Sequence, residues 1–200
     1  MYQYTDKKLK KVRFQNSALF RKYRATINFD ELNVINNTKQ LYSKLEDVNY
    51  KMYEDIANKY YMDATKSERK LNPGWLLALL TGYDYITKYV YKHEVERKRA
   101  RLAESILATK NKTLNFRTAF NLWWRQTSQY AINITDEATL QGYKDIGSKY
   151  VKWNTNIDGR ECQECRDRSN KVYPINKAPR KSHYNCRCYY TPVNKGEKND

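Results

Sequence analysis

Four cysteines and one of the two histidines lie within a short segment near the end of the 200-residue chain. The segment contains Cys162-x2-Cys165, then seventeen intervening residues, then His183-x2-Cys186-x-Cys188. Two ligands separated by two residues suit a turn that points both at one metal ion, and a second pair after a hairpin completes a tetrahedron. Cys162, Cys165, His183 and Cys186 match this paired spacing best, with Cys188 as the alternative fourth ligand. The spacing predicts a closed, structural Zn²⁺ site.

Two other uses of the cysteines stay open. Disulfides are compatible with the even count, but the basic first residues lack a following apolar run and form no recognisable secretory signal, and the cytosol keeps thiols reduced. A catalytic metal or thiol site would need an open coordination position and a partner acid or base. Asp158, Glu161, Glu164 and Asp167 could supply one in principle, but they alternate with arginines and are more simply explained as a self-paired surface. We therefore expect no enzyme and no small-molecule substrate.

The charge of the chain favours an acidic partner. Thirty-eight Lys and Arg against twenty-two Asp and Glu give a formal net charge of +16. Residues 1–27 hold eight basic residues and one acidic residue. Nucleic acid, a polyanionic protein surface or an anionic membrane surface would all complement such a charge. The longest apolar run, residues 75–80, is far shorter than the roughly twenty residues of a membrane helix, so we expect no membrane span.

The elements that must position the cysteines are mostly helical. Residues 1–27 are expected to form a basic N-terminal arm or short helix, and residues 28–148 a helical body. Asn28 or Asp30 offers an N-cap for the first long helix. Its apolar residues recur at steps of four, three, four and four, which predicts one buried stripe on an amphipathic helix: Leu41, Leu45, Val48, Met52 and Ile56.

Further cap signals divide the rest of the helical body. Asn72-Pro73 predicts a helix start, and the apolar run that follows it is expected to be buried nearly all round. Residues 116–130 form a third helical region. Thr135 or Asp136 is expected to cap a last helix that Gly147 terminates.

The last fifty residues follow a different pattern. Residues 150–153, 172–173 and 187–191 read as short strands, and Asp158-Gly159 as a turn. The sequence thus predicts a mainly α (α+β) protein, with long amphipathic helices followed by a small C-terminal zinc-stapled β element. The β-hairpin module covers residues 149–193, and residues 194–200 are expected to be a disordered tail.

The same residues form a longer pattern across about forty positions. In order, the pattern consists of Trp153, Asp158-Gly159-Arg160-x-Cys162-x2-Cys165, Asn170-Lys171-Val172-Tyr173, Pro179, His183-x2-Cys186-Arg187-Cys188 and Pro192. This combined string resembles the carboxy-terminal signature of the phage Mu F-like minor head proteins, the phage head morphogenesis family of the type found in phage SPP1.

The resemblance implies a minor capsid protein of a tailed bacteriophage. Such a protein would bind the portal protein and the major capsid or scaffolding protein, with packaged double-stranded DNA as a further partner. It would reside in the virion, at the capsid interior or portal vertex, and in the host cytoplasm during assembly.

The alternative is a zinc-ribbon nucleic-acid-binding protein that is not part of a virion. Its exposed aromatic residues would stack on bases, and the candidates are Trp123, Trp124, Trp153, Tyr189 and Tyr190. A nuclease ranks last, because no acidic or histidine catalytic set is recognisable.

Overall fold

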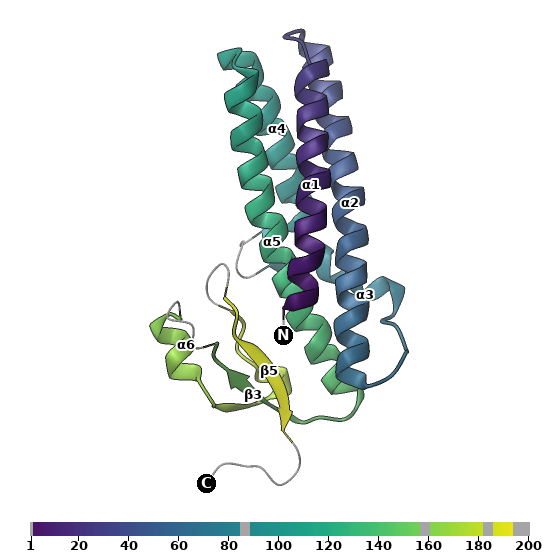
Figure 1. The fold of residues 1–200 in the computed structure, drawn as a ribbon, viewed down its shortest axis with the longest axis vertical. Coiled ribbons are helices and arrows are strands. Elements are labelled where there is room, and N and C mark those ends of the chain that lie inside the picture. Colours follow the sequence, from purple (N-terminus) through teal and green to yellow (C-terminus); the bar gives the residue numbers. More distant parts are fainter. Residues whose placement is uncertain (1, 85–88, 157–160, 182–185, 194–200) are drawn as a thin grey trace.

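The computed structural model describes residues 2–84, 89–156, 161–181 and 186–193. The chain forms a bundle of long helices with a small antiparallel sheet at one end (Figure 1), so the mainly helical fold with a C-terminal β element is confirmed. The turn expected at Asp158-Gly159, the ligand His183 and the tail 194–200 lie outside the described residues.

Among the described residues, four long helices run lengthwise through the bundle, and a short helix and a two-stranded ribbon connect the second long helix to the third. Their bounds are α1 (Gln3–Thr26), α2 (Glu31–Thr65), α3 (Pro73–Thr81), β1 (Tyr83–Asp84), β2 (Tyr89–Val90), α4 (Tyr91–Thr109) and α5 (Lys112–Asp145). Within the described residues, no helix combines the length and apolarity that crossing a bilayer requires.

The structure differs from the arm expected for residues 1–27. Residues 3–26 form α1, which packs against both α2 and α5 as a full member of the bundle. The physical reason is an apolar stripe within the basic sequence, because Leu9, Val12, Phe20 and Tyr23 are all at most 7% exposed while the lysines and arginines between them face outward.

Helix α2 follows the sequence prediction. Asp30 is its N-cap, and its carboxylate accepts the backbone N–H of Asn33 at 2.8 Å. The predicted apolar stripe is in the core, with Leu41, Leu45 and Ile56 fully buried. A buried polar chain joins this helix to its neighbours, since Asn49 accepts from Asn16 of α1 at 3.0 Å and donates to Thr127 of α5 at 2.8 Å.

The start predicted for α3 is confirmed. The prediction that this helix is buried nearly all round is wrong for one of its sides. The Asn72 side chain accepts the N–H of Gly74 at 2.8 Å, and Pro73 occupies the first turn. Leu76 and Leu80 are buried, but Leu77 is 49% exposed, because this short helix packs on the bundle with one side only.

Helix α5 is one continuous helix of 34 residues where two were expected. Thr135 caps nothing, because its hydroxyl donates to the Ala131 carbonyl one turn back in the same helix, at 2.9 Å. No proline or glycine interrupts the sequence until Gly142, so the ladder of helical hydrogen bonds continues. The predicted end is confirmed, since Gly147 follows the last turn with a φ of +82°.

Gly142 sets the spacing between the two longest helices. A Cβ at this position would lie 2.6 Å from the Cβ of Ala64 and 3.1 Å from the carbonyl oxygen of Tyr61, both on α2. Only a residue without a side chain permits this approach. The close contact anchors the lower ends of α2 and α5 just before the chain enters the C-terminal module.

The C-terminal module is a three-stranded antiparallel sheet in the order β4-β3-β5. Its elements are β3 (Tyr150–Asn154), α6 (Gln163–Arg168), β4 (Val172–Pro174), the 3-10 turn η1 (Ile175–Lys177) and β5 (Tyr189–Val193). The module has its own small core, in which Val151 and Trp153 of the central strand are fully buried and Leu140 enters from α5. Three of the four cysteines are buried in this core.

Candidate metal centre

Three cysteine sulfurs meet in the core of the C-terminal module. The Sγ atoms of Cys165, Cys186 and Cys188 all lie within 4.8 Å of one another, and those of Cys165 and Cys186 are 3.5 Å apart. Each residue is 2–3% exposed. Zinc–sulfur bonds of about 2.3 Å in a tetrahedron place neighbouring sulfurs roughly 3.8 Å apart. The three thiols could therefore hold a metal ion with little movement.

Two local structures direct these sulfurs to one point. Cys162 is the N-cap residue of α6 and Cys165 lies in its first turn, so the two-residue spacing places both at the same end of the helix. Cys186 and Cys188 precede β5 in the chain and are both buried, while Arg187 between them is partly exposed. This alternation is typical of extended backbone, in which every second side chain faces the same way.

The structure thus brings together three of the five candidate ligands. Cys188, which the spacing gave as the alternative, lies in the trio with Cys165 and Cys186. Cys162 is partly exposed, packs at the edge of the small core and contacts Cys165, but it is not a member of the trio. His183 lies outside the described residues. A fourth ligand would come from Cys162 or His183.

The thiols are chemically suited to a cation. All four cysteines are free, and the 3.5 Å separation of Cys165 and Cys186 is much longer than a disulfide bond. A hydrogen bond from Cys186 lowers the pKa of Cys188 to about 5, against the opposing effect of burial. The same hydrogen bond raises the pKa of Cys186, and burial raises that of Cys165 to about 12. The Cys188 thiolate therefore accepts hydrogen bonds from the neighbouring thiols. A divalent ion bound to all three sulfurs would displace the protons of those thiols.

Aromatic residues enclose the cysteines on the sheet side. The rings of Trp153 and Tyr190 meet edge to face with centroids 5.3 Å apart, across the pairing of β3 with β5. The guanidinium of Arg168 on α6 lies 5.4 Å from the centre of the Trp153 ring. These contacts fix α6 against the sheet and exclude water from the sulfurs.

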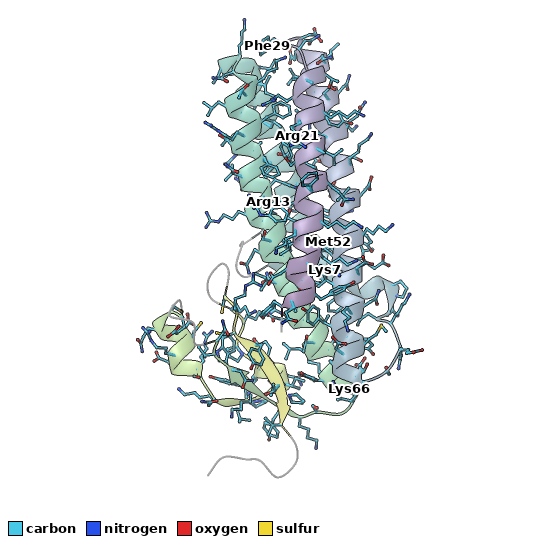
Figure 2. The ribbon with its side chains drawn as sticks, viewed as in Figure 1. Lys7, Arg13, Arg21, Phe29, Met52 and Lys66 are labelled. Atoms are coloured by element: carbon cyan, nitrogen blue, oxygen red, sulfur yellow. The ribbon has the colours of Figure 1, made fainter. Side chains whose placement is uncertain are left out.

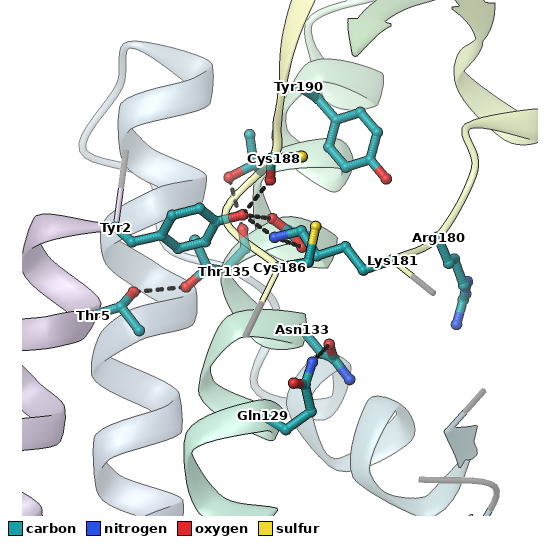
Figure 3. Close-up of polar contacts among 12 residues, drawn as sticks. Tyr2, Thr5, Gln129, Asn133, Thr135, Arg180, Lys181, Cys186, Cys188 and Tyr190 are labelled. Atoms are coloured by element: carbon teal, nitrogen blue, oxygen red, sulfur yellow. Dashed lines mark hydrogen bonds and ion pairs between the residues drawn. The ribbon is translucent and has the colours of Figure 1, made fainter. Parts of the chain in front are cut away.

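A buried polar junction joins this core to the helical bundle (Figure 3). The Lys181 ammonium lies 2.7 Å from Oδ2 of Asp136 on α5. The Tyr2 hydroxyl accepts from Lys181 and lies 2.6 Å from Oδ1 of Asp136 and 2.7 Å from the backbone oxygen of Cys188, so it donates to one of these two oxygens at a time. Burial raises the pKa of Asp136, and the Lys181 ammonium opposes that rise.

Sequence reasoning assigned Asp136 a different role, as a helix cap. Its partners lie far away in the chain, with Tyr2 separated from it by 134 positions. No spacing rule reports such a contact. The available signal was local, because Ile132 and Leu140, four residues before and after Asp136, are apolar and place it on a buried face of a continuous helix.

Comparison of this chain with known protein families, with curated proteins and with solved structures found no match. The site is therefore interpreted from its own geometry: three buried thiols, two further candidate ligands nearby in sequence, and a buried ionic junction behind them.

Proposed function

We propose that this protein is a minor head protein of a tailed bacteriophage, held in shape by one structural Zn²⁺ ion. The observation that carries the proposal is the arrangement of the C-terminal pattern in space. Trp153 and three of its cysteines, which span 36 positions of the sequence, share one small buried core. A signature of residues in a fixed order is expected when those residues pack against one another in the fold, as these do.

Zinc fits the donor set better than other common ions. Soft thiolates with an imidazole as a possible fourth donor suit zinc, whereas calcium and magnesium take oxygen ligands. The module is small, and most of its core is the cysteines, Trp153, Val151 and Tyr190. A metal that cross-links α6 to the segment before β5 would supply stability that so few apolar residues cannot.

The shape of the molecule supports a role in binding other proteins. The zinc module caps one end of the bundle, and the connection between α1 and α2 lies at the opposite end, where Phe29 is labelled in Figure 2. Phe29 is 41% exposed and Leu32 is 70% exposed. Large apolar side chains exposed together favour contact with a partner, here the portal, coat or scaffolding protein of the proposed head.

Purified heads test the proposal. The chain is co-expressed with the portal, coat and scaffolding proteins encoded in the same genome, and heads are isolated by sedimentation at high salt. We expect the protein to remain with the heads, because portal and coat contacts bury apolar surface and are weakly screened. A matched sample carries Cys165→Ser and Cys186→Ser, which should reduce incorporation. Heads that contain none of the wild-type protein would refute the assignment.

A nucleic-acid-binding protein outside a virion is the second candidate, favoured by the net charge of +16. Stacking on nucleic-acid bases would contribute little to such binding, because Trp123, Trp153 and Tyr190 are at most 2% exposed. Only Trp124 and Tyr189 of the expected aromatic set have partly exposed rings. Such a protein would bind DNA but would be missing from heads, and its absence from heads is the result that separates it from the first candidate.

A further inference from the structure

One face of α1 carries a stripe of four cations. Four exposed basic residues and one partly exposed serine recur at steps of three, four, four and three, which keeps them on the same side of the helix: Lys10, Arg13, Ser17, Arg21 and Arg24. Figure 2 labels Arg13 and Arg21 along the length of α1. At about 1.5 Å per residue, the stripe is about 21 Å long.

Helix α5 lies beside this stripe and adds to it. The guanidinium of Arg13 lies 5.6 Å from the centre of the Trp124 ring on α5, so the stripe borders the junction between the two helices. Near the far end of the bundle the junction opens into a hollow of about 210 Å³. Arg21 and Arg24 line it from α1 and Arg117 lines it from α5, together with the hydroxyl-bearing residues Ser17 and Thr113.

No acidic group balances these arginines locally. Among the described residues, Arg21, Arg24 and Arg117 have no ion pair, hydrogen bond or ring contact. The sequence of α1 has no Asp or Glu after Asp6, and that of α5 has none before Asp136. Three guanidinium groups that converge without a counter-charge repel one another, and an anion placed among them would relieve that repulsion.

We propose that this hollow and the stripe that leads to it bind the phosphodiester backbone of double-stranded DNA. Guanidinium groups recognise phosphate with paired hydrogen bonds, and the hydroxyls of Ser17 and Thr113 add neutral donors. Each strand rises by roughly 3.4 Å per nucleotide along the duplex axis, so a 21 Å stripe spans the axial length of about six base pairs. The inference extends the proposed function by giving the head protein packaged double-stranded DNA as a partner, and its test needs no incorporation into heads.

The floor of the hollow favours a backbone contact over a base contact. The aromatic residues there are packed into the bundle, with Phe20 and Phe116 at most 4% exposed. Phe20 meets Phe120 edge to face at 5.4 Å. Rings used in this way leave no open face inside the hollow on which an unpaired base could stack. Binding should therefore be independent of sequence and dominated by charge.

Fluorescence anisotropy with a labelled duplex of about 20 base pairs tests the proposal, using the full-length protein loaded with metal. Contacts from Lys10, Arg13, Arg21, Arg24 and Arg117 predict a slope of about −4.5 for log K against log salt, at about 0.9 per phosphate. Replacing Arg21, Arg24 and Arg117 by Gln should bring the slope to about −2 and weaken binding at least about tenfold near 0.1 M salt.

A matched variant distinguishes DNA binding at the hollow from binding that depends only on the net charge of the protein. Lys39→Gln, Lys44→Gln and Lys51→Gln remove the same charge from exposed positions on α2, none of which lines the hollow. We expect this variant to keep most of the affinity and to change the slope by less than about 1. Circular dichroism melting of all three proteins confirms that they are folded.

Four results would overturn the proposal: no duplex binding by the wild-type protein at low salt, an arginine variant that binds like wild type, equal losses in the arginine and lysine variants, or tighter binding of single strands or polyglutamate than of the duplex. None of these depends on head incorporation. A protein that enters heads but fails here loses only the DNA site.

Discussion

The Lys181 ammonium and the Asp136 carboxylate form a buried ion pair, 2.7 Å apart, where the C-terminal module meets α5. Their side chains are only 2% and 9% exposed. The pair joins a module that carries the predicted metal ligands to the long bundle that carries the basic surface (Figure 3), and the Arg187–Asp6 ion pair at 2.9 Å crosses the same boundary.

Breaking this pair on one side should be costly. Lys181→Met leaves the Asp136 carboxylate buried without its cation, and we expect a loss of about 3 kcal/mol in the free energy of unfolding. The double variant Asp136→Leu with Lys181→Met should lose less than the two single variants summed. Denaturant titration measures both. The exposed pair Arg180–Glu137, at 3.4 Å on the same boundary, is the control, and Glu137→Gln should cost less than about 1 kcal/mol. Equal costs at the two pairs would contradict this.

Metal removal should unfold the C-terminal module and spare the bundle. A chelator forfeits the ion's contribution to folding, which is about 10–16 kcal/mol for structural zinc in small peptides. Native mass spectrometry should find one ion per chain before chelation. Afterwards, proteolysis should cut within residues 149–193 while helical circular dichroism changes little. A protein that is metal-free when purified under reducing conditions would rule out the site.

Single substitutions should identify the ligands. Cys165→Ser, Cys186→Ser and Cys188→Ser should each abolish stoichiometric zinc binding, because the three sulfurs form one cluster. One of the two variants Cys162→Ser and His183→Ala should also abolish zinc binding, and the other should retain it. The variant that loses zinc identifies the fourth ligand. Zinc content after dialysis provides the measurement. Full zinc retention by Cys188→Ser would return Cys188 to the role of a spare thiol.

Gly142→Ala should force α2 and α5 apart. The new methyl group would lie 2.6 Å from the Ala64 Cβ, so the helices must shift, and we expect a loss of about 2 kcal/mol in stability. Gly82→Ala is the matched control, because a Cβ there meets its nearest atom at an ordinary 3.4 Å. Thermal melting of both variants decides the matter, and a Gly142→Ala protein as stable as wild type would show that the helix contact relaxes freely.

Asn49→Leu should destabilise the bundle although it makes the core more apolar. Asn49 is fully buried and bonds both Asn16 and Thr127, so its loss leaves polar groups on two helices without partners. We expect a cost of about 2 kcal/mol. Asn36→Leu, the same change at an exposed position of the same helix, should be close to neutral by the same denaturant measurement. A neutral Asn49→Leu would mean that water replaces these bonds.

Sequence patterns within a few residues predicted the helices and strands but not the contacts between them. The caps at Asp30 and Asn72 and the stripe from Leu41 to Ile56 follow from helix geometry, which depends on neighbours within a few residues. The basic sequence of α1 concealed its apolar stripe, because charge dominates its composition while only every third or fourth residue is buried.

The candidate site shows the same division. Residue types and spacing were sufficient to predict that Cys165 and Cys186 lie together as candidate metal ligands, but the inward position of Cys188 depends on the extended backbone that leads into β5. The partnership of Asp136 with Lys181 and Tyr2 arises only when distant segments fold together. Such contacts leave no periodic trace in a single sequence.

The contact between Tyr2 and the backbone of Cys188 bridges 186 positions of the chain. During synthesis, the first turn of α1 therefore emerges long before the segment that covers it has been made. Until then the Tyr2 phenol lacks this acceptor, so the first turn of α1 completes its contacts only after the C-terminal module has been made, although the rest of the helix packs against α2 and α5.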